Sequence, residues 1–134
     1  EGYFDPEAAW AAQAERALWE RLCAGGPLTA AEAAALTPSR EEFEAVWRYL
    51  KRHAAAVPLE DHAGRLAKNI AKTCHLRETY LRTMVCIRVF DERGLIQVEQ
   101  KTAGHLRIDL RPVTEKVDLE QSYLMRRLRR LAES

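Results

Sequence analysis

Two short segments near the C-terminus alternate apolar and polar residues, and a long helical pattern comes directly before them. The segments are 95–100 and 105–111, with residues 101–104 between them. Every second side chain in both is apolar, which is the period of strands with one buried and one solvated face. The helical pattern covers about 76–93, and Gly94 fits the left-handed residue that commonly ends a helix. We therefore predict a mainly helical chain with one small β-hairpin.

Further helices are predicted from their start signals, which are N-cap residues, capping boxes or a preceding proline. The predicted starts are Asp5-Pro6, Thr29, Ser39, Leu59 after Pro58, and Asp118. Helix, turn, longer helix and hairpin is the element order of a winged helix. We expect an N-terminal helical arm over 1–37 and a winged-helix-like domain over 38–134 that ends in a basic helix.

The composition is that of an ordinary globular protein, with 47% hydrophobic and 31% charged residues among 134. No apolar run approaches the roughly 20 residues of a membrane span, and no signal-peptide pattern opens the chain. Cys23, Cys74 and Cys86 form no C-x-x-C pair, so neither a disulfide framework nor a zinc ribbon is predicted. We expect a cytoplasmic protein that makes no membrane contact and binds no metal.

Charge is distributed unevenly along the chain. Residues 1–50 hold 4 Arg and 9 acids, for a net −5, whereas 51–134 hold 17 Lys or Arg and 11 acids, for a net +6. A basic half of this kind is compatible with a polyanionic partner.

The long helix is apolar on two sides, with Tyr80, Ile87 and Phe90 on one stripe and Val85 and Val89 on another. A helix that reads the major groove needs a polar outer face. We therefore predict a central packing helix and no base-specific reading.

The first helix is also apolar on two sides. Trp10 and Trp19 are nine residues apart, which places them on opposite sides of a helix. We expect one of them to pack in the core and the other to be partly exposed or to contact another chain.

Three segments resemble the C-terminal region of RecJ-type single-strand-specific exonucleases of Gram-positive-type bacteria. These exonucleases belong to the DHH phosphoesterases. The three segments are Pro38-Ser-Arg-Glu-Glu-Phe-Glu-Ala-Val-Trp-Arg-Tyr-Leu-Lys51, Val89-Phe-Asp-Glu-Arg-Gly-Leu-Ile96 and Lys116-Val-Asp-Leu-Glu-Gln-Ser122. Together they span most of residues 38–128. The order and spacing of the segments carry the resemblance.

The resemblance implies an accessory C-terminal domain of a 5′→3′ single-stranded-DNA exonuclease in DNA repair and recombination. The manganese or magnesium ions of such an enzyme would lie in the missing catalytic core, and Asp61-His62-Ala63 does not match the DHH motif. No catalytic residue and no cofactor is assigned to this chain, which also lacks the common catalytic sequence motifs. The expected partners are single-stranded DNA, the exonuclease core of the same polypeptide and, as a candidate, single-strand-binding protein.

Candidate binding residues are the cationic and aromatic side chains of the last helix and the hairpin. They are Tyr123, Arg126, Arg127 and Arg130 on the helix, and Lys101, Arg107 and Arg111 on the hairpin. Guanidinium groups beside an aromatic ring suit a single-stranded backbone with a stacked base. They would suit an acidic peptide equally well, and solvated surfaces are the simplest alternative. A free-standing winged-helix regulator of duplex DNA and a pure protein-interaction domain also stay open.

Overall fold

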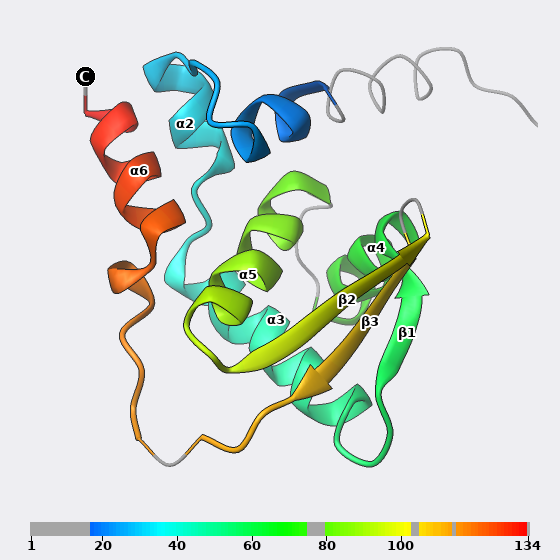
Figure 1. Cartoon of the computed structure of the whole chain (residues 1–134). Coiled ribbons are helices and arrows are strands. Elements are labelled where there is room, and N and C mark those ends of the chain that lie inside the picture. Colours follow the sequence, from blue (N-terminus) through cyan, green and yellow to red (C-terminus); the bar gives the residue numbers. More distant parts are fainter. Residues whose placement is uncertain (1–16, 75–79, 103–104, 114, 134) are drawn as a thin grey trace, which may run out of the picture.

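The computed structural model describes residues 17–74, 80–102, 105–113 and 115–133 (Figure 1). A helical segment at 17–23 comes first. The elements that follow are α2 (Ala30–Leu36), α3 (Arg40–His53), β1 (Leu59–His62), α4 (Ala63–Cys74), α5 (Tyr80–Glu92), β2 (Ile96–Thr102), β3 (His105–Leu110), the short 3-10 helix η1 (Leu119–Gln121) and α6 (Tyr123–Ala132). The described part of the chain is thus a mainly helical domain with a small antiparallel sheet.

Local start and stop signals place several helix ends where the sequence predicts them. Thr29 and Ser39 both form complete capping boxes, with Glu32 and Glu42 bonding back to the N-cap backbone. Gly94 has a φ of 75° directly after α5, so it takes the left-handed conformation that glycine adopts at little cost. The expected cap at Asp118 is wrong for the last helix, because Asp118 caps η1 and Ser122 caps α6.

The sheet has three strands in the order β1-β3-β2 and is not the two-stranded hairpin that was predicted. The helix expected from Leu59 begins only at Ala63, because residues 59–62 pair with β3. Leu59 lies opposite Ile108 on the buried face of the sheet. This pairing covers the edge of β3 that a hairpin alone would leave open.

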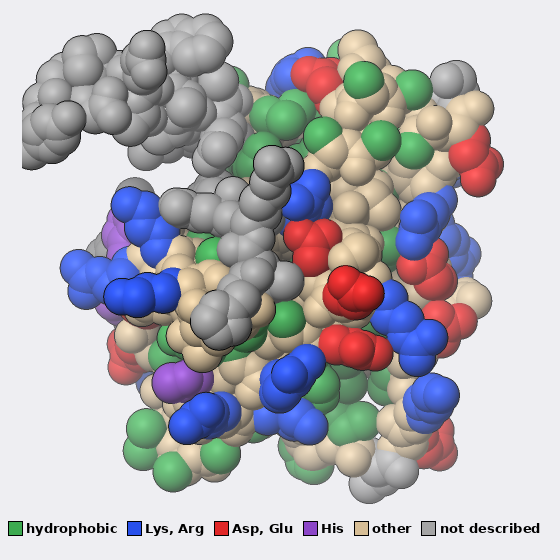
Figure 2. Space-filling model, turned by 180° about the vertical axis from the view of Figure 1, so that it is seen from behind, with side chains coloured by type: hydrophobic (Ala, Val, Ile, Leu, Met, Phe, Trp, Pro, Cys, Tyr) green, Lys and Arg blue, Asp and Glu red, His purple; other side chains and the backbone are tan. Residues whose placement is uncertain are grey.

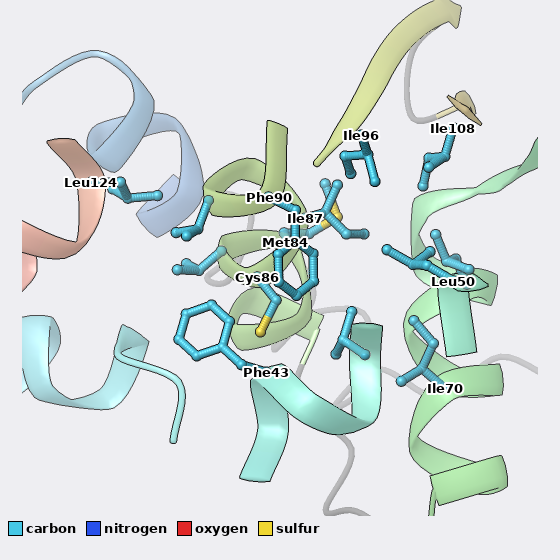
Figure 3. Close-up of a cluster of buried hydrophobic side chains, with 14 of the residues drawn as sticks. Phe43, Leu50, Ile70, Met84, Cys86, Ile87, Phe90, Ile96, Ile108 and Leu124 are labelled. Atoms are coloured by element: carbon cyan, nitrogen blue, oxygen red, sulfur yellow. The ribbon is translucent and has the colours of Figure 1, made fainter. Parts of the chain in front are cut away.

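Helix α5 is the centre of the hydrophobic core. It packs against α2, α3, α4, α6 and β2, and Figure 1 shows it between the sheet on one side and α2 and α6 on the other. The ring of Phe90 lies 5.9 Å from that of Phe43 and 5.3 Å from that of Trp47, measured between centroids. Ile87 and Leu50 belong to the same cluster (Figure 3).

Helix α6 closes the domain beside α2. Its Leu124, Met125 and Leu128 are buried, and Leu131 is half-buried against the core. Trp19 of the helical segment at 17–23 is also partly buried against the core. The prediction for Trp10 concerns a residue outside the described ranges.

Candidate functional site

Helix α5 has too little exposed surface to enter a DNA groove. Seven of the eight residues 83–90 are buried, and Arg88 is the exception. The buried residues are Thr83, Met84, Val85, Cys86, Ile87, Val89 and Phe90. Arg82, half-buried, donates to Glu42 of α3 at 2.8 Å, and Arg88 donates to the sulfur of Cys23 at 3.4 Å. The prediction of a central packing helix is confirmed, and among the described side chains of α5 those classed as exposed are Arg88, Asp91 and Glu92.

The arginines of α6 are largely engaged within the chain. Arg127 donates to the carbonyl oxygens of Leu22 at 2.9 Å and Gly26 at 2.6 Å, and so joins α6 to the end of the helical segment at 17–23. Arg126 donates to Gln121 at 3.1 Å. These bonds occupy two of the three arginines that the sequence proposed for binding.

The remaining cations of α6 differ from one another. Arg129 makes a bidentate pair with Glu120, at 3.0 and 3.1 Å. Arg130 is exposed and has no hydrogen-bond or ion-pair partner among the described residues. Tyr123 is 72% exposed at the start of the helix. With partners counted over the described residues alone, α6 therefore offers a ligand one unpaired guanidinium and one exposed ring.

The outer face of the sheet is not a cationic surface. Arg107 lies opposite Glu60 on β1 and Glu99 on β2, and its Nε is 3.4 Å from Asp109 Oδ2. His105 Nε2 is 3.7 Å from Glu60 Oε1. Three carboxylates around one guanidinium would repel a phosphate chain. Arg107 is therefore a weak candidate for phosphate binding.

Two further hairpin residues had been proposed for binding. Arg111 is exposed just beyond β3, and its backbone N–H donates to the carbonyl of Leu95 at 3.0 Å. The side chain of Lys101 lies outside the part of the structure that is described. Of the hairpin cations that the sequence predicts for binding and whose side chains are described, Arg111 is the exposed one.

A denser cationic surface lies on α3 and α4, which pack together. We call it the α3–α4 basic face, and its exposed members are Arg48, Lys51, Arg52, Arg65, Lys68 and Lys72. Figure 2 shows Lys and Arg side chains along the left and lower parts of the molecule, with histidine and apolar side chains next to them. The spacings of three, four and seven residues place each helix's members on one side of that helix.

Few acids neutralise the α3–α4 basic face. Arg65 Nε is 3.9 Å from Asp61 Oδ1, and Lys51 Nζ lies 5.9 Å from the ring centroid of Trp47. The other four cations have no ion-pair partner within the ranges that the structure describes. They are Arg48, Arg52, Lys68 and Lys72. Unpaired, solvated cations of this kind are free to contact phosphates.

The sequence contains a signal for this face that is less conspicuous than a motif. Arg65, Lys68 and Lys72 follow a helical spacing, and the described residues 62–74 contain no Asp or Glu. The stretch 45–59 likewise contains no acid. The four arginines of α6 stood out more in the sequence, although most of them are internally bonded.

An aromatic stack lies at the end of α3 within this face. Tyr49 is 8% exposed, and its ring is stacked on that of the exposed His53, with centroids 4.1 Å apart and planes inclined by 27°. Burial raises the pKa of Tyr49 above its usual value, and the nearby Asp61 and Cys74 raise it further by smaller amounts. A buried, neutral phenol ring thus supports one face of an exposed imidazole.

A groove of about 800 Å³ lies on another side of α3, between this helix and residues 113 and 115–120. Phe43, Trp47 and Phe90 contribute apolar surface to it. Its charged lining residues are Arg40, Lys116 and Arg129 against Glu44, Glu115, Asp118 and Glu120. Ion pairs join Arg40 to Glu44 and Arg129 to Glu120. The groove is therefore apolar with a nearly balanced rim, and it does not favour a polyanion.

The described ranges contain no grouping of side chains suited to metal binding or to thiol chemistry. They contain no group of three or more His, Cys, Asp or Glu side chains that could hold a metal ion. Burial raises the pKa of the Cys86 thiol above its usual value, which suits an inert core residue. Cys74 Sγ contacts the carbonyl oxygen of Ala45 at 3.6 Å.

No helix within the described ranges is both long and apolar enough to cross a membrane. Comparison of the chain with protein-family models, curated proteins and solved structures finds no significant match.

Proposed function

We infer that the chain is an accessory domain that binds single-stranded nucleic acid by its phosphates, through the α3–α4 basic face. The observation that carries this proposal is that two adjacent helices present four exposed cations with no ion-pair partner in the described ranges. Phosphate contacts provide affinity without sequence information. The contribution of the domain would be to hold a strand, while any chemistry takes place elsewhere.

The order of elements supports a winged-helix assignment. The chain runs α3-β1-α4-α5-β2-β3, with the sheet ordered β1-β3-β2, and β2 and β3 would form the wing. Helix α5 occupies the position of a recognition helix, but α2 and α6 contact it on the side opposite the sheet. This covering favours an accessory domain over the alternative of a sequence-reading regulator.

The resemblance to RecJ-type exonucleases supports the proposed context. The three similar segments form α3, the junction of α5 with β2, and the segment that contains η1. We propose that the chain serves such an enzyme in DNA repair or recombination, with the divalent ions held by the exonuclease core. Extension of the reading frame upstream through a DHH core would support this context.

A second candidate function is protein recruitment, which the apolar groove beside α3 favours. Single-strand-binding protein is the partner that the resemblance suggests. The four carboxylates on the groove rim would repel its acidic tail, so the groove supports recruitment of a mainly apolar segment and not of that tail.

The proposal is tested by titrating a labelled single-stranded oligonucleotide with the chain at about 50 and 200 mM salt. Four phosphate contacts on a single strand, at about 0.7 each, predict a log–log salt slope of about −2.8 and an approximately 50-fold loss of affinity over this range. Two oligonucleotides of unrelated sequence should bind alike. Salt-resistant binding of one duplex sequence would contradict the proposal and favour the regulator.

A further inference from the structure

We propose that His53 is a stacking platform for one unpaired nucleobase. Stacking on this residue makes the α3–α4 basic face selective for single strands over duplexes. This inference rests on the proposed function, because stacking adds specificity to a strand that phosphate contacts already hold. The site consists of the imidazole of His53, the Tyr49 ring beneath it and the cations around them.

One face of the imidazole is supported by an aromatic ring of the core. Tyr49 is almost fully buried, so its ring position is set by the core, and it covers one face of the His53 ring at a centroid distance of 4.1 Å. His53 is itself exposed. A planar ring that is supported on one face and solvated elsewhere loses little further conformational freedom when a base stacks on it.

The surroundings of His53 suit a nucleotide. Arg52 precedes it, Arg48 lies one helical turn before Arg52, and both guanidiniums are exposed with no ion-pair partner among the described residues. After His53, the loop that follows α3 exposes Ala55, Ala56 and Val57, the last of which is 66% exposed. Cations next to an aromatic platform and small apolar groups are the combination that binds a backbone together with a base.

The same arrangement discriminates between classes of polyanion. In a duplex both faces of each base are covered by its neighbours, so only phosphates can reach this surface. In a single strand a base can unstack at little cost and transfer to an aromatic ring. An acidic peptide would pair with the cations but would leave the platform unused. The geometry therefore favours single-stranded nucleic acid.

The test replaces His53 with alanine in the whole chain and measures binding to three labelled ligands. These are an oligothymidine, an oligonucleotide of equal length that carries only abasic sites, and a duplex. Loss of one base stack is worth about 1 kcal/mol at the low end, so affinity for oligothymidine should fall about 5-fold. Affinities for the abasic strand and the duplex should change less than about 2-fold, since their contacts are to phosphates alone.

His53→Phe serves as the matched variant, because it keeps a planar ring over Tyr49 and removes the imidazole nitrogens. It should bind oligothymidine at least as well as the parent chain. Equal losses on all three ligands would overturn the stacking role and leave His53 with a charge or structural role. If His53→Ala binds oligothymidine as the parent does while Lys68→Glu with Lys72→Glu does not, the platform is wrong and the proposed function stands. If neither variant weakens binding, the proposed function fails as well.

Discussion

Reversing two charges on α4 is expected to remove most of the affinity for single-stranded DNA. Lys68→Glu combined with Lys72→Glu eliminates two phosphate contacts and introduces two repulsive charges beside the strand. Both side chains are exposed on the side of α4 opposite the buried Leu66 and Ile70, so the fold should be unaffected. We expect a loss of at least about 10-fold at 50 mM salt. The log–log salt slope should fall in magnitude from about 2.8 to about 1.4.

A matched control tests whether the position of the charges matters. Arg126→Glu with Arg130→Glu on α6 changes the net charge of the chain by the same amount and also alters two exposed cations. Affinity should fall only about 2-fold or less, through the long-range field alone. An equal loss in the two variants would assign binding to overall charge, and a larger loss in the α6 variant would place the site on that helix.

Arg127→Ala is expected to lower the free energy of unfolding by about 2 to 4 kcal/mol, because it removes two hydrogen bonds from a charged donor. The carbonyl of Leu22 would keep the N–H of Gly25 as a donor, at 3.2 Å. The lost contacts are those to Leu22 and Gly26, which join α6 to the chain 101 and 105 residues earlier. The measurement is urea unfolding followed by circular dichroism. A lower midpoint with an unchanged m-value would show that stability alone has changed.

The comparison variant is Arg130→Ala on the same helix, where the guanidinium has no described partner. Its free energy of unfolding should change by less than about 0.5 kcal/mol. Similar stabilities of the two variants would contradict the structural role assigned to Arg127. Since Arg127 supports the fold, a loss of binding in any variant that includes it has to be separated from loss of folding.

The sequence was a good guide where structure depends on local signals. The capping boxes at Thr29 and Ser39, the left-handed Gly94 and the inward alternation of Leu106 and Ile108 are all read within a few residues. Strand β1 was missed because four residues carry too little periodicity to distinguish a strand from the first turn of a helix. Its pairing with β3 is a contact across more than 40 residues and has no local signature.

The candidate site was harder to predict, because its definition depends on which cations are already bonded. The clustered arginines of α6 are conspicuous in the sequence, whereas the carbonyl partners of Arg127 lie more than 100 positions away. The spacing of Lys68 and Lys72 was readable, but only the structure shows that neither has an ion-pair partner within the part of the chain that is described. The support of His53 by Tyr49 likewise depends on the burial of Tyr49 by the core.

The most direct test of the account is a titration of the ¹⁵N-labelled chain with oligothymidine, followed by the chemical shifts of the backbone amides. We predict that the largest changes occur in residues 48–53 and 65–72, and that adding salt reverses them. Amides of α6, of the groove segment 115–120 and of α5 should move little. Changes concentrated on α6 or in the groove, with residues 48–53 and 65–72 unaffected, would contradict the assignment of the α3–α4 basic face as the binding surface.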